Sequence, residues 1–174
     1  ADFDPCLVLL NNDLSGGLPA ILEGLEQTLL PPPGLGWTHR SKSHHFDLYA
    51  EVAGEFADQL GLDPWLLTPA SRYCGQVDFQ KREGLECLEA NGAALLAEIA
   101  ERYAKRDIDH PPFLIVKADA GTYGMGVMSV SSIDEITQIN RKTRNKMSSA
   151  KEGLPVSRVL IQEGIPTAET WGSD

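Results

Sequence analysis

The residues best suited to chemistry are a lysine and the glycine-rich segment that follows it. Lys117 ends an apolar run that begins at Phe113, and Gly121, Gly124 and Gly126 come soon after. Glycine lets the backbone adopt positive φ angles and approach a ligand closely. Successive amide groups can then point into one concavity and bind an anion. Because a lysine ammonium suits phosphate oxygens, residues 113–130 predict a strand, a phosphate-binding loop and a second strand.

An ordinary hairpin is the alternative interpretation of this segment. Glycines also gather in hairpin turns and bulges for local reasons, and a lysine at a strand end often extends its ammonium into solvent. The spacing is not that of a P-loop, because no Gly-Lys-Ser/Thr follows. It is not the dinucleotide fingerprint either, because the glycine spacing differs and no helix opens after Gly126. We favour a nucleotide phosphate, and the motif alone leaves both interpretations open.

A polar loop near the start of the chain is a second candidate. The apolar run at residues 6–10 predicts a buried strand, and open α/β sheets bind ligands beyond the carboxyl ends of their strands. From the residues alone, a helix-entry loop is the favoured interpretation of residues 11–17. The side chains that could contact a substrate there are Asn11, Asn12, Asp13 and Ser15.

Two basic residues, Arg40 and Lys42, lie just before a predicted helix. The amino end of a helix favours an anion, although a solvated loop explains the pair equally well. His39, His44 and His45 lie nearby, but adjacent histidines do not form the i, i+4 ligand pair of a helical zinc site. We therefore expect no metal site in this chain.

The composition of the chain is that of a globular protein. Its 174 residues are 42% hydrophobic and 23% charged, which is enough for one domain or two small ones. The formal net charge of -10 repels nucleic acid and acidic membranes, so we expect neither as a partner. An anionic nucleotide would need local basic groups and a metal ion to offset this charge.

The cysteines bear on the cellular compartment. Cys6, Cys74 and Cys87 are odd in number and show no Cys-x-x-Cys spacing, which argues against a zinc or redox pair. We expect small structural thiols and a reducing, cytoplasmic location, although Cys74 or Cys87 as a nucleophile is conceivable. No apolar run approaches a membrane span, and the amino end lacks the features of a signal peptide.

Hydrophobic periodicity predicts the elements that must position the candidate residues. We expect a loop at 72–82, and a final helix with acidic residues first and basic residues last, an order that complements its dipole and explains the basic cluster without nucleic acid. Asn91-Gly92 could bend the helix that contains it. Strands are expected at residues 6–10, 65–68, 113–117, 127–130 and 159–165. Helices are expected at residues 18–29, 43–60, 84–105 and 132–146.

The order of these elements resembles a known superfamily. A strand ending in Lys117, a glycine loop, a strand, a helix and a strand that ends in Gln162-Glu163-Gly-Ile165 are similar to the small lobe of ATP-grasp enzymes. Four strings in order resemble the proteobacterial type of glutamate–cysteine ligase, and the resemblance covers nearly the whole chain. The strings are Asn12-Asp-Leu-Ser-Gly-Gly-Leu-Pro19, Trp37-Thr-His-Arg-Ser-Lys-Ser-His-His-Phe46, Asp63-Pro-Trp-Leu-Leu-Thr-Pro69 and Lys117-Ala-Asp-Ala-Gly-Thr-Tyr-Gly-Met-Gly126.

The resemblance implies a function and a set of site residues. The implied reaction joins the γ-carboxylate of L-glutamate to the amine of L-cysteine through an acyl phosphate, with ATP and Mg²⁺ as cofactors. This is the first step of glutathione synthesis. By position, Lys117 and Lys42 would contact the nucleotide, and residues 11–17 with Arg40 are weaker candidates for the amino-acid side. The flap would comprise Gly121, Thr122, Tyr123, Gly124, Met125 and Gly126, and the adenosine would be held by Gln162, Glu163 and Ile165.

The resemblance also implies an α/β fold in three parts. Residues 1–70 would form a pre-ATP-grasp-like βα region, 71–110 a connecting helical segment, and 111–174 the small-lobe hairpin, helix and hinge strand. In the superfamily a large lobe with the magnesium ligands and catalytic residues follows the hinge strand, whereas this sequence starts at Ala1 and stops at Asp174. We therefore expect an inactive portion of a longer ligase, with a non-catalytic nucleotide-binding or scaffold domain as the alternative. A kinase-like site is disfavoured because the lysine precedes the loop.

Overall fold

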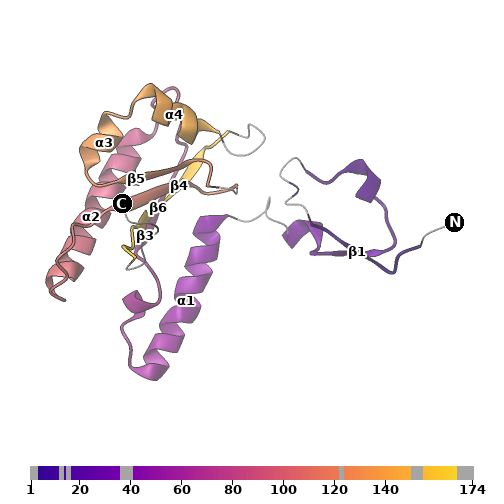
Figure 1. Cartoon of the computed structure of the whole chain (residues 1–174), viewed down its shortest axis with the longest axis horizontal. Coiled ribbons are helices and arrows are strands. Elements are labelled where there is room, and N and C mark those ends of the chain that lie inside the picture. The colour runs from indigo at the N-terminus through magenta and orange to yellow at the C-terminus, as the bar shows by residue number, and fades with distance from the viewer. Residues whose placement is uncertain are drawn as a thin grey trace, which may run out of the picture.

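The computed structural model describes residues 4–11, 14, 17–35, 41–121, 124–149 and 155–167. Within these ranges the chain forms a two-stranded sheet, a four-stranded sheet and four α-helices (Figure 1). The fold is therefore mixed α/β, as the sequence predicts.

The amino-terminal unit is a small parallel pair of strands. β1 (Leu7–Leu9) pairs with β2 (Thr28–Leu30), and the 3-10 turns η1 (Ala20–Leu22) and η2 (Pro33–Leu35) accompany them. The helix expected at 18–29 is wrong, because Pro19 has an extended backbone and Gly24 a left-handed one. The expected burial of the first strand is also wrong, since Leu9 is 74% exposed.

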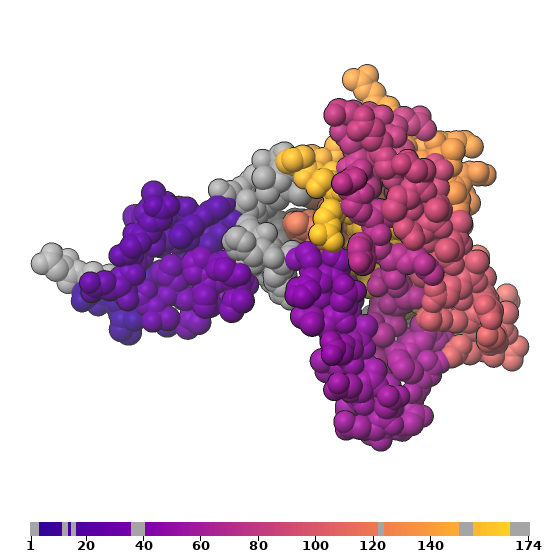
Figure 2. All heavy atoms as spheres, turned by 180° about the vertical axis from the view of Figure 1, so that it is seen from behind, coloured from indigo at the N-terminus to yellow at the C-terminus, as the bar shows by residue number. Residues whose placement is uncertain are grey.

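Helix α1 (Lys42–Leu60) confirms the prediction for this segment. The Ser41 hydroxyl caps it by accepting from the His44 amide, and Gly61 ends it with a left-handed backbone. The apolar stripe is only half covered. Ala53 and Ala57 are buried, whereas other large apolar side chains remain exposed on α1, which stands at the surface in Figure 2. The exposed members are Leu48, Tyr49, Val52, Phe56 and Leu60.

The strand expected at 65–68 is wrong. That segment is the 3-10 turn η4 (Pro64–Leu66), capped by Asp63. The strand is instead β3 (Ser71–Gly75), which overlaps the loop expected at 72–82. The sequence gives little sign of it, because Ser-Arg-Tyr-Cys-Gly contains no apolar run. Its burial alternates, with Cys74 buried and Tyr73 54% exposed, but the polar and apolar residues do not alternate in the same way.

The four-stranded sheet has the order β3-β6-β4-β5. β4 (Leu114–Ala118) and β5 (Val127–Val130) form the predicted hairpin, with Lys117 opposite Val127. β6 (Arg158–Glu163) pairs antiparallel with both β3 and β4 and confirms the last predicted strand. β3 joins this sheet although it lies in the segment 71–110 expected to connect two parts, and the division of the chain into three parts stays a prediction.

Helix α2 (Leu85–Ala104) covers one face of the sheet without a break at Asn91-Gly92. Gly92 is buried in the packing, where a Cβ would lie 3.2 Å from Ile133 Cδ1. The core between helix and sheet includes Leu88, Leu95, Ile99, Leu114, Val116, Val159 and Ile161.

The helix expected from Ser132 is two helices, α3 (Ile133–Thr137) and α4 (Arg141–Ser148). Asn140 caps α4 by accepting a hydrogen bond from the Thr143 amide. A new helix therefore begins at Arg141, and the helix that starts at Ile133 does not continue into it. The acidic and basic residues therefore belong to separate helices, and the single-dipole explanation of the basic cluster is wrong.

Cys74 and Cys87 form a disulfide between β3 and α2, contrary to the expectation of separate thiols. The two cysteines are 13 residues apart in sequence, and only the packing of α2 on β3 brings them together. The pairing removes the cysteine argument for a reducing compartment, so the cytoplasmic location stays a prediction. Among the described helices, none combines the length and apolar character needed to span a bilayer.

Candidate functional site

The site begins with the alternation of side chains across the four-stranded sheet. On β4, Leu114 and Val116 point into the core under α2, so Lys117 lies on the opposite face. On β6 the same alternation places Gln162 on the face of Lys117. There the Lys117 ammonium donates a hydrogen bond to Gln162 Oε1 at 2.5 Å.

The first turns of α1 bring two more groups to this face. The Phe46 ring centre lies 5.2 Å from Lys117 Nζ, within cation–π distance. The Lys42 ammonium donates to the carbonyl oxygens of Ala118 at 2.7 Å and Gly121 at 2.9 Å, at the entry to the glycine loop. Two lysines from distant parts of the chain therefore converge at the base of this loop.

The electrostatics of the two lysines favour an anion between them. Burial lowers the pKa of Lys117. Burial also lowers the pKa of Lys42, where the nearby Asp119 carboxylate opposes the shift and the positive charge of Lys117 adds to it. A bound polyanion would offset both the desolvation of these ammonium groups and their mutual repulsion.

Gln162 carries an unused donor beside this pair. The residue is only 6% exposed, and its Nε2 atom has no hydrogen-bond partner among the described residues. A buried amide without a partner is rare in native proteins. These N–H groups are therefore available to a ligand or a solvent molecule.

The glycine loop has the backbone that its sequence predicts. Gly121, Gly124 and Gly126 all have positive φ angles. The Gly126 carbonyl accepts from the Ala118 amide at 2.8 Å, while Met125 is 44% exposed. Thr122 and Tyr123, the other predicted flap residues, lie outside the described ranges.

Of the three residues expected to hold the adenosine, only Gln162 lies beside Lys117. Glu163 is buried on the opposite face, where its Oε2 accepts from the Trp65 indole at 2.8 Å and the Ala70 amide at 3.1 Å. Ile165 is 62% exposed beyond the end of β6. The Glu163 carboxylate is thus hydrogen-bonded within the fold. The roles of Glu163 and Ile165 in holding the adenosine stay predictions.

The predicted amino-acid side of the site is less defined. Asn11 lies just after β1 and is exposed. Asn12, Asp13, Ser15 and Arg40 fall outside the residues that the structure describes. Their contact with a substrate stays a prediction.

Sequence reasoning missed two residues of the site. Phe46 lies in the predicted helix at 43–60 and was not expected near the site, but its ring lies near Lys117. Asp119, only 3% exposed, contacts the amino end of α1 through the hydrogen bonds described below. The signal for Asp119 was an acid placed between a strand lysine and the glycine loop, although its partner cannot be read from local sequence.

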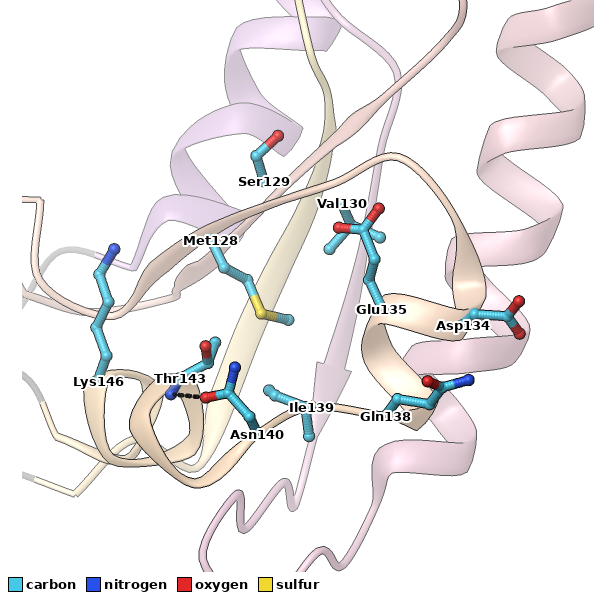
Figure 3. A pocket seen from close by; sticks show the side chains of 10 residues that line it. All are labelled: Met128, Ser129, Val130, Asp134, Glu135, Gln138, Ile139, Asn140, Thr143 and Lys146. Atoms are coloured by element: carbon cyan, nitrogen blue, oxygen red, sulfur yellow. Dashed lines mark hydrogen bonds between the residues drawn. The ribbon is translucent and has the colours of Figure 1, made fainter.

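Two hollows occur in the described part of the molecule, and neither is lined by Lys42 or Lys117. One, of about 470 Å³, has Phe46, Trp65 and Arg106 in its walls. The other, of about 530 Å³, lies between edge strand β5 and the helices α3 and α4, and Glu135 and Lys146 are among the residues that line it (Figure 3). No cluster of three or more His, Cys, Asp or Glu side chains suited to a metal ion occurs in the described ranges.

Comparison with known proteins decides the family. A sequence model of the family described as "Glutamate-cysteine ligase" matches residues 1–174. The chain belongs to the glutamate–cysteine ligase family. The resemblance identified from the four sequence strings is thereby confirmed at the level of this family.

A solved structure agrees with this assignment. It is described as "Putative gamma-glutamylcysteine synthetase" from Methylobacillus flagellatus KT, with 56% sequence identity and a TM-score of 0.83. The match covers 93% of this chain and 38% of that chain, so the sequence spans well under half of its relative. A search of curated proteins gives no match.

Proposed function

We propose that this chain forms the ATP-binding part of a ligase that joins the γ-carboxylate of L-glutamate to the amine of L-cysteine. The observation that carries the proposal is the convergence of two half-buried ammonium groups, Lys42 and Lys117, at the base of a glycine loop. Family membership supports the reaction class. The antiparallel sheet with its glycine hairpin supports an ATP-grasp small lobe.

The groups around the lysine pair fit the parts of ATP. The two ammonium groups offset the charge of the phosphates, and the amides near Gly121, Gly124 and Gly126 supply further donors. The Gln162 carboxamide offers one acceptor and an unused donor, the combination with which Gln pairs to the adenine edge. Phosphate oxygens that accept from Lys117 would release Gln162 Oε1 for this purpose.

The chemistry follows from the poor reactivity of a carboxylate. ATP, when bound, supplies the phosphoryl group that makes an acyl phosphate, from which the cysteine amine displaces phosphate. The work of this chain is to orient the nucleotide and neutralise its charge, and such positioning accounts for most catalysis in phosphoryl transfer. Lys117 and Lys42 perform it from one side of the site.

Magnesium does not fit a site within the described residues, since they contain no suitable cluster of acidic or histidine side chains. We therefore assign no step of this chain to the metal. We further propose that the polypeptide by itself does not complete the ligation. The alternative, a non-catalytic nucleotide-binding or scaffold domain, is favoured by the same lack of a metal cluster.

Calorimetric titration with ATP tests the binding proposal. The parent chain should bind ATP, and Lys117→Met should bind at least tenfold more weakly because a buried charge-assisted contact is lost. Lys142→Met removes the same charge from an exposed position on α4 and serves as the matched control. Equal affinity in Lys117→Met and Lys142→Met would exclude the lysine pair as the phosphate site.

An activity assay tests the proposed inactivity of the isolated chain. The purified chain, given ATP, Mg²⁺, L-glutamate and L-cysteine, should form no γ-glutamylcysteine. Product formation would overturn the proposed inactivity and exclude the scaffold alternative. The substrates, a cytoplasmic location and the absence of nucleic-acid and membrane partners remain part of this proposal.

A further inference from the structure

The Asp119 side chain joins the glycine loop to helix α1. Its Oδ1 accepts a hydrogen bond from the Ser43 amide at 2.7 Å, and its Oδ2 accepts from the Ser43 hydroxyl at 3.0 Å. Arg158 Nε lies 3.7 Å from Oδ2 and adds an ion pair from β6. With 3% exposure, this carboxylate is almost fully removed from solvent.

The main chain of Asp119 strengthens the same junction. Its carbonyl accepts from the Lys42 amide at 2.8 Å, and its amide donates to the Arg158 carbonyl at 3.0 Å. One residue therefore connects the end of β4, the start of α1 and strand β6. Both its side chain and its backbone take part.

Capping of α1 alone does not explain this arrangement. Ser41 already caps the helix by accepting from the His44 amide. The Asp119 carboxylate occupies a second acceptor position at the same end, where a negative charge is favoured by the helix dipole. The consequence is geometric, because the Lys42 ammonium then reaches the carbonyls of Ala118 and Gly121.

We propose that Asp119 is a positioning residue of the ATP site. By holding Ser43 and Lys42 against the base of the glycine loop, it sets the Lys42 ammonium beside Lys117 before the nucleotide binds. This inference rests on the proposed ATP binding, and it assigns no direct contact between Asp119 and ATP.

The charge of Asp119 has a second, measurable effect on Lys42. The charged groups at this junction are Lys117 on β4, Asp119 after it and Arg158 on β6. Asp119 opposes the lowering of the Lys42 pKa that burial and Lys117 cause. If Lys42 stayed in place, neutralising Asp119 would lower its pKa further. If Asp119 positions Lys42, the ammonium instead leaves its half-buried place when the carboxylate is neutralised, and its pKa moves back toward the ordinary lysine value of 10.5.

The first test needs no nucleotide. The Lys42 pKa is measured from the pH dependence of its side-chain ¹³Cε NMR signal, assigned with Lys42→Arg, in the parent, Asp119→Asn and Asp58→Asn. Asp58 is an exposed acid on the same helix and provides the control for charge removal. We expect the Lys42 pKa to rise toward 10.5 in Asp119→Asn alone, with the fold retained. A parent-like or lower Lys42 pKa in that variant would show that Lys42 keeps its place without the carboxylate, and would overturn the inference.

The second test measures ATP affinity by calorimetry. Asp119→Asn should weaken binding about tenfold and Ser43→Ala about threefold, as expected for loss of a charged or neutral hydrogen bond, respectively. Asp58→Asn should stay within about twofold of the parent. Parent-like affinity in Asp119→Asn would overturn the inference. If that variant does not fold, parent-like affinity in Ser43→Ala overturns it.

The two tests separate this inference from the proposed function. If the parent chain does not bind ATP, the proposed function fails, and the role of Asp119 in ATP binding fails with it. The NMR result then still decides whether Asp119 places Lys42. If ATP binds to the parent and the Lys42 pKa does not rise in Asp119→Asn, only the positioning role fails.

Discussion

Two glycines of the flap allow the reasoning about the phosphate loop to be tested at matched positions. Gly124 and Gly126 have φ angles of +67° and +62°, so alanine at either position meets the same left-handed strain. Their surroundings differ. A Cβ at Gly124 would have no atom within 4 Å, whereas a Cβ at Gly126 would lie 3.0 Å from the Ala118 Cβ.

The expected magnitudes follow from this difference. Left-handed backbone costs an L-residue about 1–2 kcal/mol, and Gly124→Ala should lose about this much free energy of unfolding. In Gly126→Ala, crowding adds about 1–3 kcal/mol. Ala118 cannot move away freely because it pairs with Val159 in β6 and donates to the Gly126 carbonyl.

Thermal unfolding distinguishes the two variants. For a chain of this size, 1 kcal/mol corresponds to about 2–4 °C in Tm, so Gly126→Ala should lose roughly twice as many degrees as Gly124→Ala. It should also weaken ATP binding more, because Ala118 adjoins Lys117. A Gly126→Ala variant as stable as Gly124→Ala would refute the argument that close packing at the loop base holds the lysine in place.

Two further predictions concern charge and burial. The pKa values of Lys42 and Lys117 lie below the ordinary lysine value of 10.5, so calorimetric ATP affinity should fall as pH rises through the lowered values. Without ATP, the unfolded state binds more protons than the folded state between the lowered pKa values and 10.5. The free energy of unfolding from urea titrations should therefore rise with pH in this range. A fall would contradict the lowered pKa values. Trp65→Phe keeps an aromatic side chain, although a smaller one, and removes the indole donor to Glu163; it should lower the urea-derived free energy of unfolding by about 1–3 kcal/mol. Tyr73→Phe, a 54% exposed position, should cost little, and equal losses in the two variants would argue against the buried bond.

The elements that sequence patterns predict well are those with strong, uninterrupted periodicity. Helices α1 and α2 show apolar residues at helical spacing over many turns, and β4 and β6 are apolar runs buried on both faces. β3 escapes because Ser-Arg-Tyr-Cys-Gly contains no apolar run, so Tyr73 and Cys74 give no continuous signal. The false helix at 18–29 had helical spacing, but the backbone of Pro19 and Gly24 prevented it.

Some residues of the candidate site could likewise be predicted from local sequence, and others could not. Lys117 and the glycine loop lie within one short hairpin, so local sequence contains their relationship. The contact of Lys42 with Ala118 joins residues 76 positions apart. Family resemblance suggested Lys42 as a nucleotide contact, but the sequence did not predict this hydrogen bond. Asp119 and Phe46 needed the packing of α1 against the sheet, which no periodicity specifies.

Two adjacent residues of strand β6 lie on opposite faces of the sheet and make different contacts. Gln162 faces the lysine pair, while Glu163, one peptide bond further, anchors Trp65 and Ala70 on the other side. A slip of β6 by a single residue would exchange these faces, bringing a carboxylate to the proposed phosphate site and leaving the core anchor without its acceptor. Deletions or insertions inside this strand should therefore be far less tolerable than substitutions, since strand alignment itself encodes the charge of the site.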